Sequence, residues 1–353
     1  GRGERGRRRR LARRVGRGRR GGERARDGRA RGAPREAGRG VDRGGVVRDG
    51  GGHAEEVPRA PGRGNASCYA RRVLTLAERY DDPTVYAIPL YVLAMAGEVL
   101  ALRGRARLGD RAVVGYELKD TLASLGMGVG SLVFAGAIQL GVFLLAERLW
   151  AHRLVDLGTG ALGWAVALLG WDFTFYWHHR WSHEVRLFWA SHVNHHSSLH
   201  YNLSTALRQE WTPFTNLLLL PPWALLGVRP TMLVFAGGLN LIYQFFLHTE
   251  VVGKLPRPLE LVLNTPSHHR VHHASNGRYL DKNYGGVLIV FDRLFGTFAE
   301  EEEPCVYGLT TNITSKNPLV IASHEYVAVF RQLARARSVA GAFRVLTRMP
   351  PDP

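Results

Sequence analysis

The sequence predicts an all-α integral membrane protein, a bundle of about four to five membrane helices that carries a histidine-rich helical cap. Long apolar stretches follow one another from residue 85 onward, and one of them has 25 residues without a charge. Of the 15 histidines, 12 lie between His178 and His273. The two cysteines, Cys68 and Cys305, are too few for a disulfide scaffold, a four-cysteine iron–sulfur cluster or a cysteine-built zinc site. The cysteine count therefore excludes a metal site built from cysteines, and the clustered histidines are the candidate ligands.

Residues 1–72 differ in composition from the rest of the chain. They hold 23 arginines, no lysine and 8 acidic residues, which accounts for +15 of the formal net charge of +17. With one aromatic residue among them, they cannot bury enough apolar surface to offset chain entropy, so we expect a disordered extension. An arm that binds RNA or anionic lipid is one interpretation. Arginine without lysine favours a non-native extension instead, and we expect no nucleic-acid partner. Residues 73–353 are expected to form one membrane-embedded domain.

Five stretches have the composition of membrane helices: residues 85–102, 121–145, 154–177, 212–228 and 231–247. The second is long enough to span a bilayer, and its uniform apolarity argues against a buried helix of a soluble protein. The last two, at about 17 residues each, are marginal spans. Arg229-Pro230 predicts a turn between them, so they form either two crossings or a hairpin that dips into the bilayer.

Three glycines, Gly126, Gly128 and Gly130, recur at every second position inside the second stretch. A glycine-rich pattern can mark a dinucleotide-binding turn, but that turn must lie between a strand and a helix. Inside a predicted membrane helix, small residues instead let a neighbouring segment approach closely. We therefore predict close packing at these glycines.

The order of the apolar stretches places every histidine-rich segment on one face of the membrane. If the third stretch ends on side A near Tyr176, residues 178–211 lie on side A, and the hairpin returns His248 and all later residues to it. The loop 103–120 is also on side A and carries five Lys/Arg, whereas the turn 146–153 on the other side carries two. The positive-inside rule then makes side A cytoplasmic. Five full crossings would leave the N-terminal extension on the far face, so either the first stretch does not cross or the extension is not native.

Three histidine boxes and one isolated histidine form the candidate metal-binding pattern. The boxes are His179-x-x-x-His183, His192-x-x-His195-His196 and His269-x-x-His272-His273, and His248 ends the last apolar stretch. A helix turns about 100° per residue, so an H-x-x-H-H unit is expected to present three imidazoles toward one point. Two such units and the H-x-x-x-H pair give too many ligands for one tetrahedral zinc ion and suit a dinuclear site with open positions. Imidazole binds iron, zinc and copper comparably, so the ligand type does not name the metal.

The polar residues near the boxes have weaker patterns. Asp172 lies two helical turns before His179 inside an apolar stretch, and we expect it to accept an N–H from a ligating imidazole. Asp281 and Asn283, just after the third box, are expected either to do the same or to cap a loop. Three further histidines are expected to be neighbours of the ligands or bystanders: His178, His200 and His268.

These motifs resemble those of the fatty acid hydroxylase / sterol desaturase superfamily. The matching segments are DFTFYWHHRWSH (172–183), HVNHHSSLHYNLSTALR (192–208), FFLHTE with His248, and TPSHHRVHH (265–273) followed by LDKNYGG and FDRLFGTF. Two further segments, KDTLASLGMGVGSL (119–132) and VYGLTTNITSKNPL (306–319), are most similar to the alkylglycerol monooxygenase branch and its bacterial relatives. The resemblance covers roughly residues 85–345. It departs at His200, where family members often carry an acid.

The resemblance implies a metal site and a reaction. Carried over position by position, the metal ligands are His179, His183, His192, His195, His196, His248, His269, His272 and His273. The implied metal is a pair of iron ions, although a crystal could contain zinc, and the implied reaction is O2-dependent hydroxylation of a lipid. The sequence shows no haem, flavin or nicotinamide motif, so electrons would come from a separate electron-transfer protein or a reductant such as tetrahydrobiopterin.

Several activities stay open at this point. An alkylglycerol substrate would be hydroxylated next to its ether oxygen and would then collapse to glycerol and a fatty aldehyde. A sibling reaction would hydroxylate or desaturate a sterol, a fatty acid or a carotenoid. A third alternative is a membrane protein with a structural zinc cluster and no turnover. In each case we expect an integral membrane protein with its metal site on the cytoplasmic face.

Overall fold

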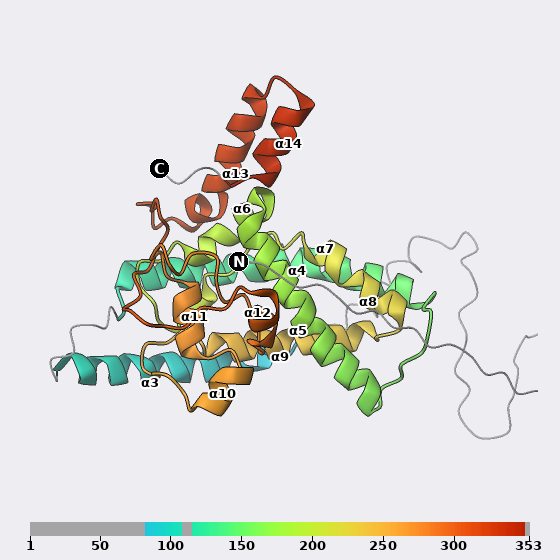
Figure 1. Cartoon of the computed structure of the whole chain (residues 1–353), viewed down its shortest axis with the longest axis horizontal. Coiled ribbons are helices and arrows are strands. Elements are labelled where there is room, and N and C mark those ends of the chain that lie inside the picture. Colours follow the sequence, from blue (N-terminus) through green and yellow to red (C-terminus); the bar gives the residue numbers. More distant parts are fainter. Residues whose placement is uncertain (1–81, 108–114, 350–353) are drawn as a thin grey trace, which may run out of the picture. The chain divides into compact units, whose positions relative to one another are not determined.

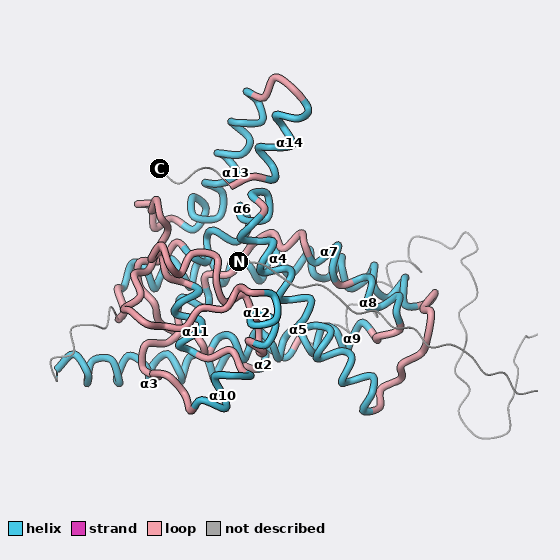
Figure 2. The backbone as a smooth tube through the Cα atoms, in the orientation of Figure 1, coloured by secondary structure: helices cyan, strands magenta, loops and turns pink. Residues whose placement is uncertain are grey.

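A computed structural model describes residues 82–107 and 115–349 of the chain (Figure 1). The predictions for residues 1–72 lie outside the described residues. Within the described ranges the regular elements are helices, and extended pairing is limited to two isolated bridges, Leu263 with Leu288 and Ala274 with Tyr307 (Figure 2). The predicted all-α class is confirmed for this part of the chain.

The described helices, in chain order, are α2 (Pro83–Tyr86), α3 (Ile88–Arg107), α4 (Leu118–Trp150), α5 (Ala161–Glu184), α6 (Arg186–His196), the 3-10 helix η1 (Thr205–Leu207), α7 (Asn216–Leu219), α8 (Pro221–Leu226), α9 (Pro230–Phe245), α10 (Arg257–Val262), α11 (Pro266–His272), α12 (Val290–Phe295), α13 (Pro318–Arg335) and α14 (Val339–Thr347).

Helix α4 contains the long apolar stretch and has 33 residues. It begins after Glu117, whose carboxylate accepts hydrogen bonds from the backbone amides of Lys119 and Asp120 (3.0 and 2.7 Å). Among the described helices, α4 alone is both long and apolar enough to cross a membrane. Only 17% of its most apolar window is buried, which is unlike a core helix of a soluble protein. The prediction of four to five membrane helices goes beyond this one helix and stays a prediction.

The other apolar stretches also form helices, with boundaries shifted by turn residues. The third stretch becomes helical only at Ala161, after a turn in which Gly158 has φ +61°. The predicted turn between the last two stretches is confirmed. Helix α8 ends at Leu226 and is followed by Gly227 with φ +116°, a left-handed conformation that glycine adopts without strain. Pro230 is the first residue of α9.

The three glycines of α4 pack closely against other segments, as predicted. A Cβ atom on Gly126 would lie 2.8 Å from Cγ of Pro318, and one on Gly128 would lie 3.0 Å from the carbonyl oxygen of Leu207. At Gly130 the added atom would lie 2.2 Å from Cζ2 of Trp211. Larger side chains at these positions would therefore push α13 and the segment around η1 away from α4.

Helices α5, α6 and α9 form the support of the histidine boxes. Val185 alone joins α5 to α6, and its extended conformation turns α6 back against α5. Helix α5 packs on α9 through Ala167 and Leu233. The Trp171 ring of α5 lies so close to Gly237 of α9 that a side chain at position 237 would clash with it. The first two boxes therefore sit on helices whose mutual position is set by tight packing.

Candidate metal centre

The structure brings the nine histidines of the predicted ligand set together in two neighbouring buried groups. In each group the candidate ligand nitrogens all lie within 4.8 Å of one another. The first group is His179, His183, His192, His196 and His272. The second group is His195, His248, His269 and His273. The groups adjoin each other, since the stacked rings of His196 and His273 have centroids 4.4 Å apart.

The expectation that each H-x-x-H-H box presents three imidazoles toward one point is wrong. In the second box His192 and His196 join the first group, while His195 joins the second. The third box mirrors this arrangement, because its outer pair joins the second group and His272 joins the first. The physical reason is angular: residues i and i+4 differ by about 40° around a helix, whereas i+3 lies about 60° to the other side of i. Each box therefore bridges both groups.

In four of the nine rings, the Nδ1 atom is hydrogen-bonded to a backbone carbonyl oxygen. In the first group, Nδ1 of His179 donates to the Tyr284 carbonyl (2.9 Å) and Nδ1 of His272 to the Lys282 carbonyl (3.0 Å). In the second group, His195 donates to the Arg208 carbonyl (3.2 Å) and His248 to the Gln244 carbonyl (2.8 Å). Because carbonyl oxygens only accept, these bonds place the proton on Nδ1 and leave the Nε2 lone pair free.

The Nε2 atoms converge in a way that fits bound cations. Nε2 of His192 lies 3.1 Å from that of His179 and 3.2 Å from that of His196, and Nε2 of His248 lies 3.1 Å from that of His269. With the protons of His179 and His192 on Nδ1, their close contact sets two lone pairs against each other with no hydrogen between them. Two nitrogens bound to one metal at about 2.1 Å lie roughly 3.0–3.4 Å apart, which matches these separations. The all-imidazole donor set therefore fits two metal ions.

Burial keeps five of the clustered histidines uncharged. It lowers the pKa of His272 to about 3 and that of His248 to about 4. Burial, with neighbouring imidazoles as a further cause, also lowers the pKa of His195, His196 and His269 well below the ordinary value. At neutral pH these rings are neutral imidazoles, the form that coordinates a metal ion.

The predicted role of Asp172 is corrected by the structure. Its carboxylate accepts hydrogen bonds from the backbone amides of Val287 and Leu288 (2.7 and 3.0 Å) and from the side chain of Asn240 (3.0 Å). The side chain thus points to the segment after the third box rather than to a ligating imidazole. Two helical turns place Asp172 on the same side of α5 as His179. Its carboxylate is nevertheless hydrogen-bonded to the backbone of residues 287–288 and to Asn240 of α9, and not to an imidazole.

The residues after the third box divide between the two expected roles. Asp281 lies 3.8 Å from Nδ1 of His183 but its side chain is largely exposed. Asn283 holds a loop, since its amide donates to the carbonyls of His268 and Ala299 (3.0 and 2.8 Å). Both residues have φ of +58°, a conformation that Asp and Asn tolerate better than most residues.

The three histidines next to the boxes lie outside both groups. Nε2 of His268 lies 2.8 Å from a carboxylate oxygen of Glu260, and His178 contacts Thr215 and lies near Glu210. His200 precedes Tyr201, whose ring packs on His248 and His273, but His200 itself is a member of neither group. None of the three is a member of a group, in line with their interpretation as neighbours or bystanders.

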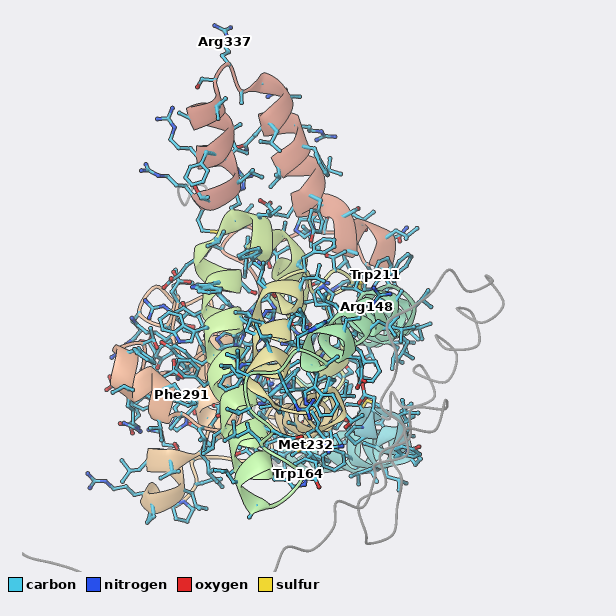
Figure 3. The ribbon with its side chains drawn as sticks, turned by 90° about the vertical axis from the view of Figure 1, so that its right-hand side faces the viewer. Arg148, Trp164, Trp211, Met232, Phe291 and Arg337 are labelled. Carbon is cyan, nitrogen blue, oxygen red and sulfur yellow. The ribbon has the colours of Figure 1, made fainter. Side chains whose placement is uncertain are left out.

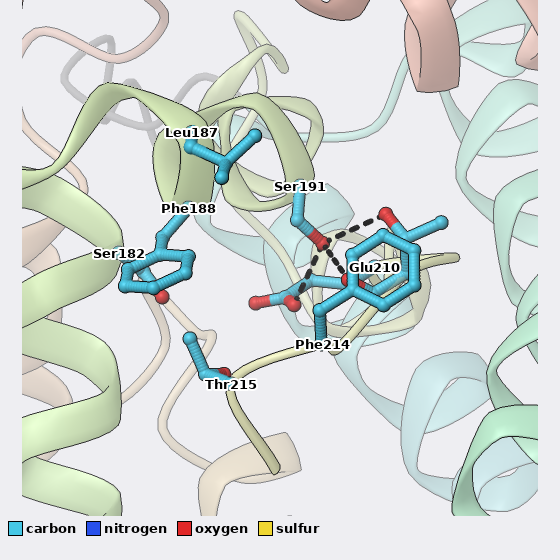
Figure 4. Close-up of a pocket in the computed structure, with 8 residues that line it drawn as sticks. Ser182, Leu187, Phe188, Ser191, Glu210, Phe214 and Thr215 are labelled. Carbon is cyan, nitrogen blue, oxygen red and sulfur yellow. Dashed lines mark hydrogen bonds between the residues drawn. The ribbon is translucent and has the colours of Figure 1, made fainter. Parts of the chain in front are cut away.

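Glu210 is the acidic neighbour that sequence reasoning missed. Its carboxylate accepts a hydrogen bond from Nδ1 of His192 (2.7 Å) and one from the Ser191 hydroxyl (3.0 Å, Figure 4). Burial acts to raise the pKa of this carboxyl, but hydrogen bonds from His178 and His192 outweigh it and hold the pKa well below its usual range. Glu210 is therefore the carboxylate that orients a candidate ligand, the role expected of Asp172. No spacing rule points to it, because it follows its histidine by 18 residues in an irregular segment.

Tyr284 is the second missed neighbour, although it belongs to the LDKNYGG segment. Its ring is fully buried, and the ring centroids of His183 and His179 lie 5.3 and 5.9 Å away. Its hydroxyl has no hydrogen-bond partner among the described residues. A buried phenol O–H without a partner is costly, so Tyr284 is a candidate hydrogen-bond donor to a molecule bound beside the first group.

Comparisons with known proteins agree with this site. Residues 164–297 match the family model for fatty acid hydroxylase, and this range contains all nine histidines. The chain is 42% identical to alkylglycerol monooxygenase of Homo sapiens over 239 residues, and 44% identical to that of Danio rerio over 200 residues. It is 30% identical to an ornithine lipid hydroxylase of Rhizobium tropici over 135 residues. No solved structure matches the chain.

The coverage of these matches is partial. They span 66%, 55% and 38% of this chain, respectively, and 53%, 44% and 40% of the relatives. The chain therefore spans about half the length of the relatives it matches. The predicted resemblance is confirmed: residues 164–297 match the fatty acid hydroxylase family model, and the chain is similar to the alkylglycerol monooxygenases.

Proposed function

We propose that the chain is an O2-dependent lipid monooxygenase whose two histidine groups hold a pair of iron ions. The observation that carries the proposal is the convergence of nine buried imidazoles into two adjoining groups, in which the Nε2 atoms of seven rings lie 3.1–3.2 Å from one another in pairs. Two groups suit two ions, and the family match favours lipid oxidation over a structural role. Bound iron would supply the redox chemistry that activates O2 toward an unreactive C–H bond.

The proposed substrate is an alkylglycerol ether lipid, as the names of several relatives suggest. Hydroxylation consumes O2, two electrons and two protons, and it yields one hydroxylated carbon and one water. If that carbon adjoins the ether oxygen, the product is a hemiacetal, which collapses to glycerol and a fatty aldehyde. The electrons would come from an external reductant, either tetrahydrobiopterin or an electron-transfer protein.

The residues of the chain would hold and shield this chemistry. The carbonyls of Tyr284, Lys282, Arg208 and Gln244 fix the imidazole rings before any metal binds, so the site is preorganised. The Tyr284 hydroxyl would offer a proton donor next to the first group. Because all nine histidines are buried, bulk water is kept from the reacting carbon.

An apolar hollow between α3 and α4 would take the alkyl chain. It has a volume of about 440 Å³ and is lined by Met95, Ala96, Val99, Leu100, Tyr116, Thr121 and Leu125. At its polar end the Tyr116 hydroxyl donates to Glu98 (2.5 Å), which also accepts from the Leu203 amide and from Thr249. Thr249 directly follows His248, so these hydrogen bonds link Tyr116 of the hollow to the residue beside a histidine of the second group.

We further propose that the protein is integral to a membrane with its metal site on the cytoplasmic face. The exposed apolar surface of α4, with residues such as Val129, Leu132 and Val133, is what a lipid-facing helix presents. The excess of Lys/Arg in the loop 103–120 over the turn 146–153 supports this orientation. Accessibility of a cysteine introduced at Arg257 to a membrane-impermeant reagent in intact cells would test it, since labelling without permeabilisation contradicts a cytoplasmic face.

Product analysis tests the proposed function. The purified protein, loaded with Fe(II), is incubated with an alkylglycerol, 18O2 and either reduced pterin or a generic one-electron donor. We expect O2 uptake and a fatty aldehyde that depends on both iron and reductant. A sterol, fatty acid or aminolipid that is hydroxylated when it replaces the alkylglycerol would assign a sibling reaction, and the similarity to an ornithine lipid hydroxylase favours the last of these. Tightly held zinc with no O2 uptake under any reductant would refute an oxygenase.

Glu210→Ala is expected to weaken metal binding by roughly 10–100-fold, because His192 loses the acceptor that fixes its ring. Glu210→Gln keeps an acceptor oxygen and is expected to lose less. The measurement is the dissociation constant for Fe(II) or Zn(II) from chelator competition. Glu184→Ala is the matched control, since Glu184 is a half-exposed acid on α5 whose partner is Arg180. Equal metal affinity in Glu210→Ala and the control would show that Glu210 does not position His192.

Val99→Trp is expected to reduce kcat/KM for long-chain alkylglycerols by about 10-fold or more, because the larger ring fills the hollow. Short-chain substrates should lose less, so the chain-length profile shifts. Leu93→Trp is the control, as Leu93 lies on the same helix, is exposed and does not line the hollow. A profile that is unchanged in Val99→Trp would move the chain-binding site elsewhere.

A further inference from the structure

Helix α13 has an exposed apolar stripe opposite the face that it buries. Its buried face packs through Ile321 and Val329 and is fixed by Glu325, which pairs with Arg186 of α6 at 2.8 Å. The exposed large apolar side chains are Leu319, Val320, Val327 and Phe330. At about 100° per residue these four positions fall within roughly 100° of arc, so they form one continuous stripe.

Helix α14 repeats the pattern at the end of the described chain. Val339 is 89% exposed and Phe343 is 65% exposed, and the two positions lie about 40° apart around the helix. The two helices pack against each other and on α6, so they form a hairpin, defined here as the C-terminal hairpin, residues 318–349. Isolated exposed apolar residues are ordinary, but two aligned stripes on one hairpin indicate a binding surface.

The charge of the C-terminal hairpin is one-sided. Residues 318–349 contain five arginines and one acid, Glu325, which Arg186 already neutralises. None of the five arginines forms an ion pair within the part of the chain that the structure describes. On α13, Arg331 and Arg335 lie along one edge of the apolar stripe, about 20° and 60° beyond it. Arg344 of α14 and Arg348, which directly follows α14, lie about 100° and 140° from Phe343 around the helix axis. Arg337 at the turn points away from the neighbouring helices (Figure 3).

The hairpin lies at the level where α4 becomes apolar. Pro318 at its start contacts Gly126, and Ile321 packs on Ala123 and Met127, just past the polar first turn of α4. Figures 1 and 3 both show α13 and α14 running across the axis of α4. If α4 spans a bilayer, a helix that crosses its axis at this level lies along the membrane surface.

We propose that the C-terminal hairpin binds the surface of an anionic phospholipid membrane, with Phe330 and Phe343 inserted among the acyl chains and the flanking arginines bound to phosphate groups. Apolar stripes bordered by arginine are the composition of interfacial helices. The rim of a site for a protein partner usually carries charges of both signs, whereas the hairpin has five arginines and its one acid is paired with Arg186. This one-sided charge favours an anionic lipid surface over a protein partner. The inference rests on the membrane placement of α4 in the proposed function, but not on its metal or its substrate.

Lipid-quenching fluorescence tests the hairpin directly. The full chain, with Cys68→Ser and Cys305→Ser, carries Phe343→Cys labelled with an environment-sensitive dye. It is placed in nanodiscs of phosphatidylcholine alone or with about one third phosphatidylglycerol. We expect a blue-shifted emission that is quenched by doxyl-labelled lipid in the anionic discs. Arg331→Gln with Arg335→Gln should reduce the quenching by about five-fold or more. Arg257→Gln with Arg278→Gln, which removes two arginines outside the hairpin, should not.

The outcomes separate the alternatives. A dye that stays water-exposed in both lipid mixtures overturns the proposal. If the dye stays buried in lipid-free amphipol and its burial rises with protein concentration, the stripes contact a second copy of the chain. If its burial in amphipol does not depend on concentration, the stripes contact another segment of the same chain. Both results overturn it as well. Metal content and O2 uptake are measured on the same samples, so a failed oxygenase with a lipid-quenched hairpin would dismiss the proposed function and leave this surface standing.

Discussion

His272→Ala is expected to abolish lipid oxidation, with a loss of at least about 100-fold, and to lower the metal content of the protein. His272 is the one member of the third box in the first histidine group, and its Nε2 lies 3.2 Å from that of His196. Its removal therefore opens the first group and breaks the link between α6 and α11 within it. The measurements are metal per protein by plasma mass spectrometry and aldehyde formation from an alkylglycerol.

His268→Ala is the sharpest control for this prediction. His268 adjoins His269 in the same box and is equally buried, but its Nε2 lies 2.8 Å from a carboxylate oxygen of Glu260 and it belongs to neither group. We expect this variant to keep its metal. If His272→Ala retains full metal and full activity, or if both variants lose metal alike, the division of the histidines into two groups is not what holds the ions.

The helical class and the nine clustered histidines could be predicted because both depend on local pattern. Apolar stretches and turn residues such as Arg229-Pro230 predict helices and their ends, and the H-x-x-H-H spacing predicts inward faces. The way each box divides could not be taken from the box alone. Residue i+3 can share a metal with residues i and i+4 or contribute to a second one. Which of these occurs depends on where the second histidine group lies relative to the helix, and that position is set by how α6, α11 and the end of α9 come together.

The acidic partner of a ligand was placed wrongly for a related reason. Asp172 has the periodicity of a residue that faces His179, but the backbone amides of Val287 and Leu288 reach its carboxylate first. Glu210 has no periodic relation to the boxes and arrives through the irregular segment after η1. Long-range contacts of this kind depend on loop paths, and loop paths are weakly encoded in residue spacing.

A buried network of charged residues is connected to the second histidine group through Arg208, and a substitution in it is expected to have a large effect on stability. Asp120, at the start of α4, accepts hydrogen bonds from Arg208 (2.8 Å), from Ser198 (2.5 Å) and from Lys316 (2.6 Å). Arg208 is 1% exposed, and its backbone carbonyl is the acceptor for Nδ1 of His195. The ion pair thus ties α4 to the segment that orients a histidine of the second group.

Asp120→Ala is expected to lower the free energy of unfolding by about 3–5 kcal/mol, because it leaves the Arg208 guanidinium buried without a counter-charge. Arg208 would then move toward water, and its carbonyl would no longer fix His195, so metal affinity should fall as well. Denaturant unfolding in detergent and chelator competition measure the two effects. Lys316→Ala removes the half-exposed partner of the same carboxylate and should cost only about 0–1 kcal/mol.

The double variant Asp120→Ala with Arg208→Met separates the two contributions. It removes the uncompensated charge, so stability should recover most of the loss seen in Asp120→Ala. The backbone carbonyl of residue 208 is still present in the double variant, but the side-chain bonds to Ser124 and Ser197 that hold this segment are gone. Metal affinity should therefore stay low while stability returns. Recovery of both together would mean that the network serves stability alone and that His195 is oriented by other contacts.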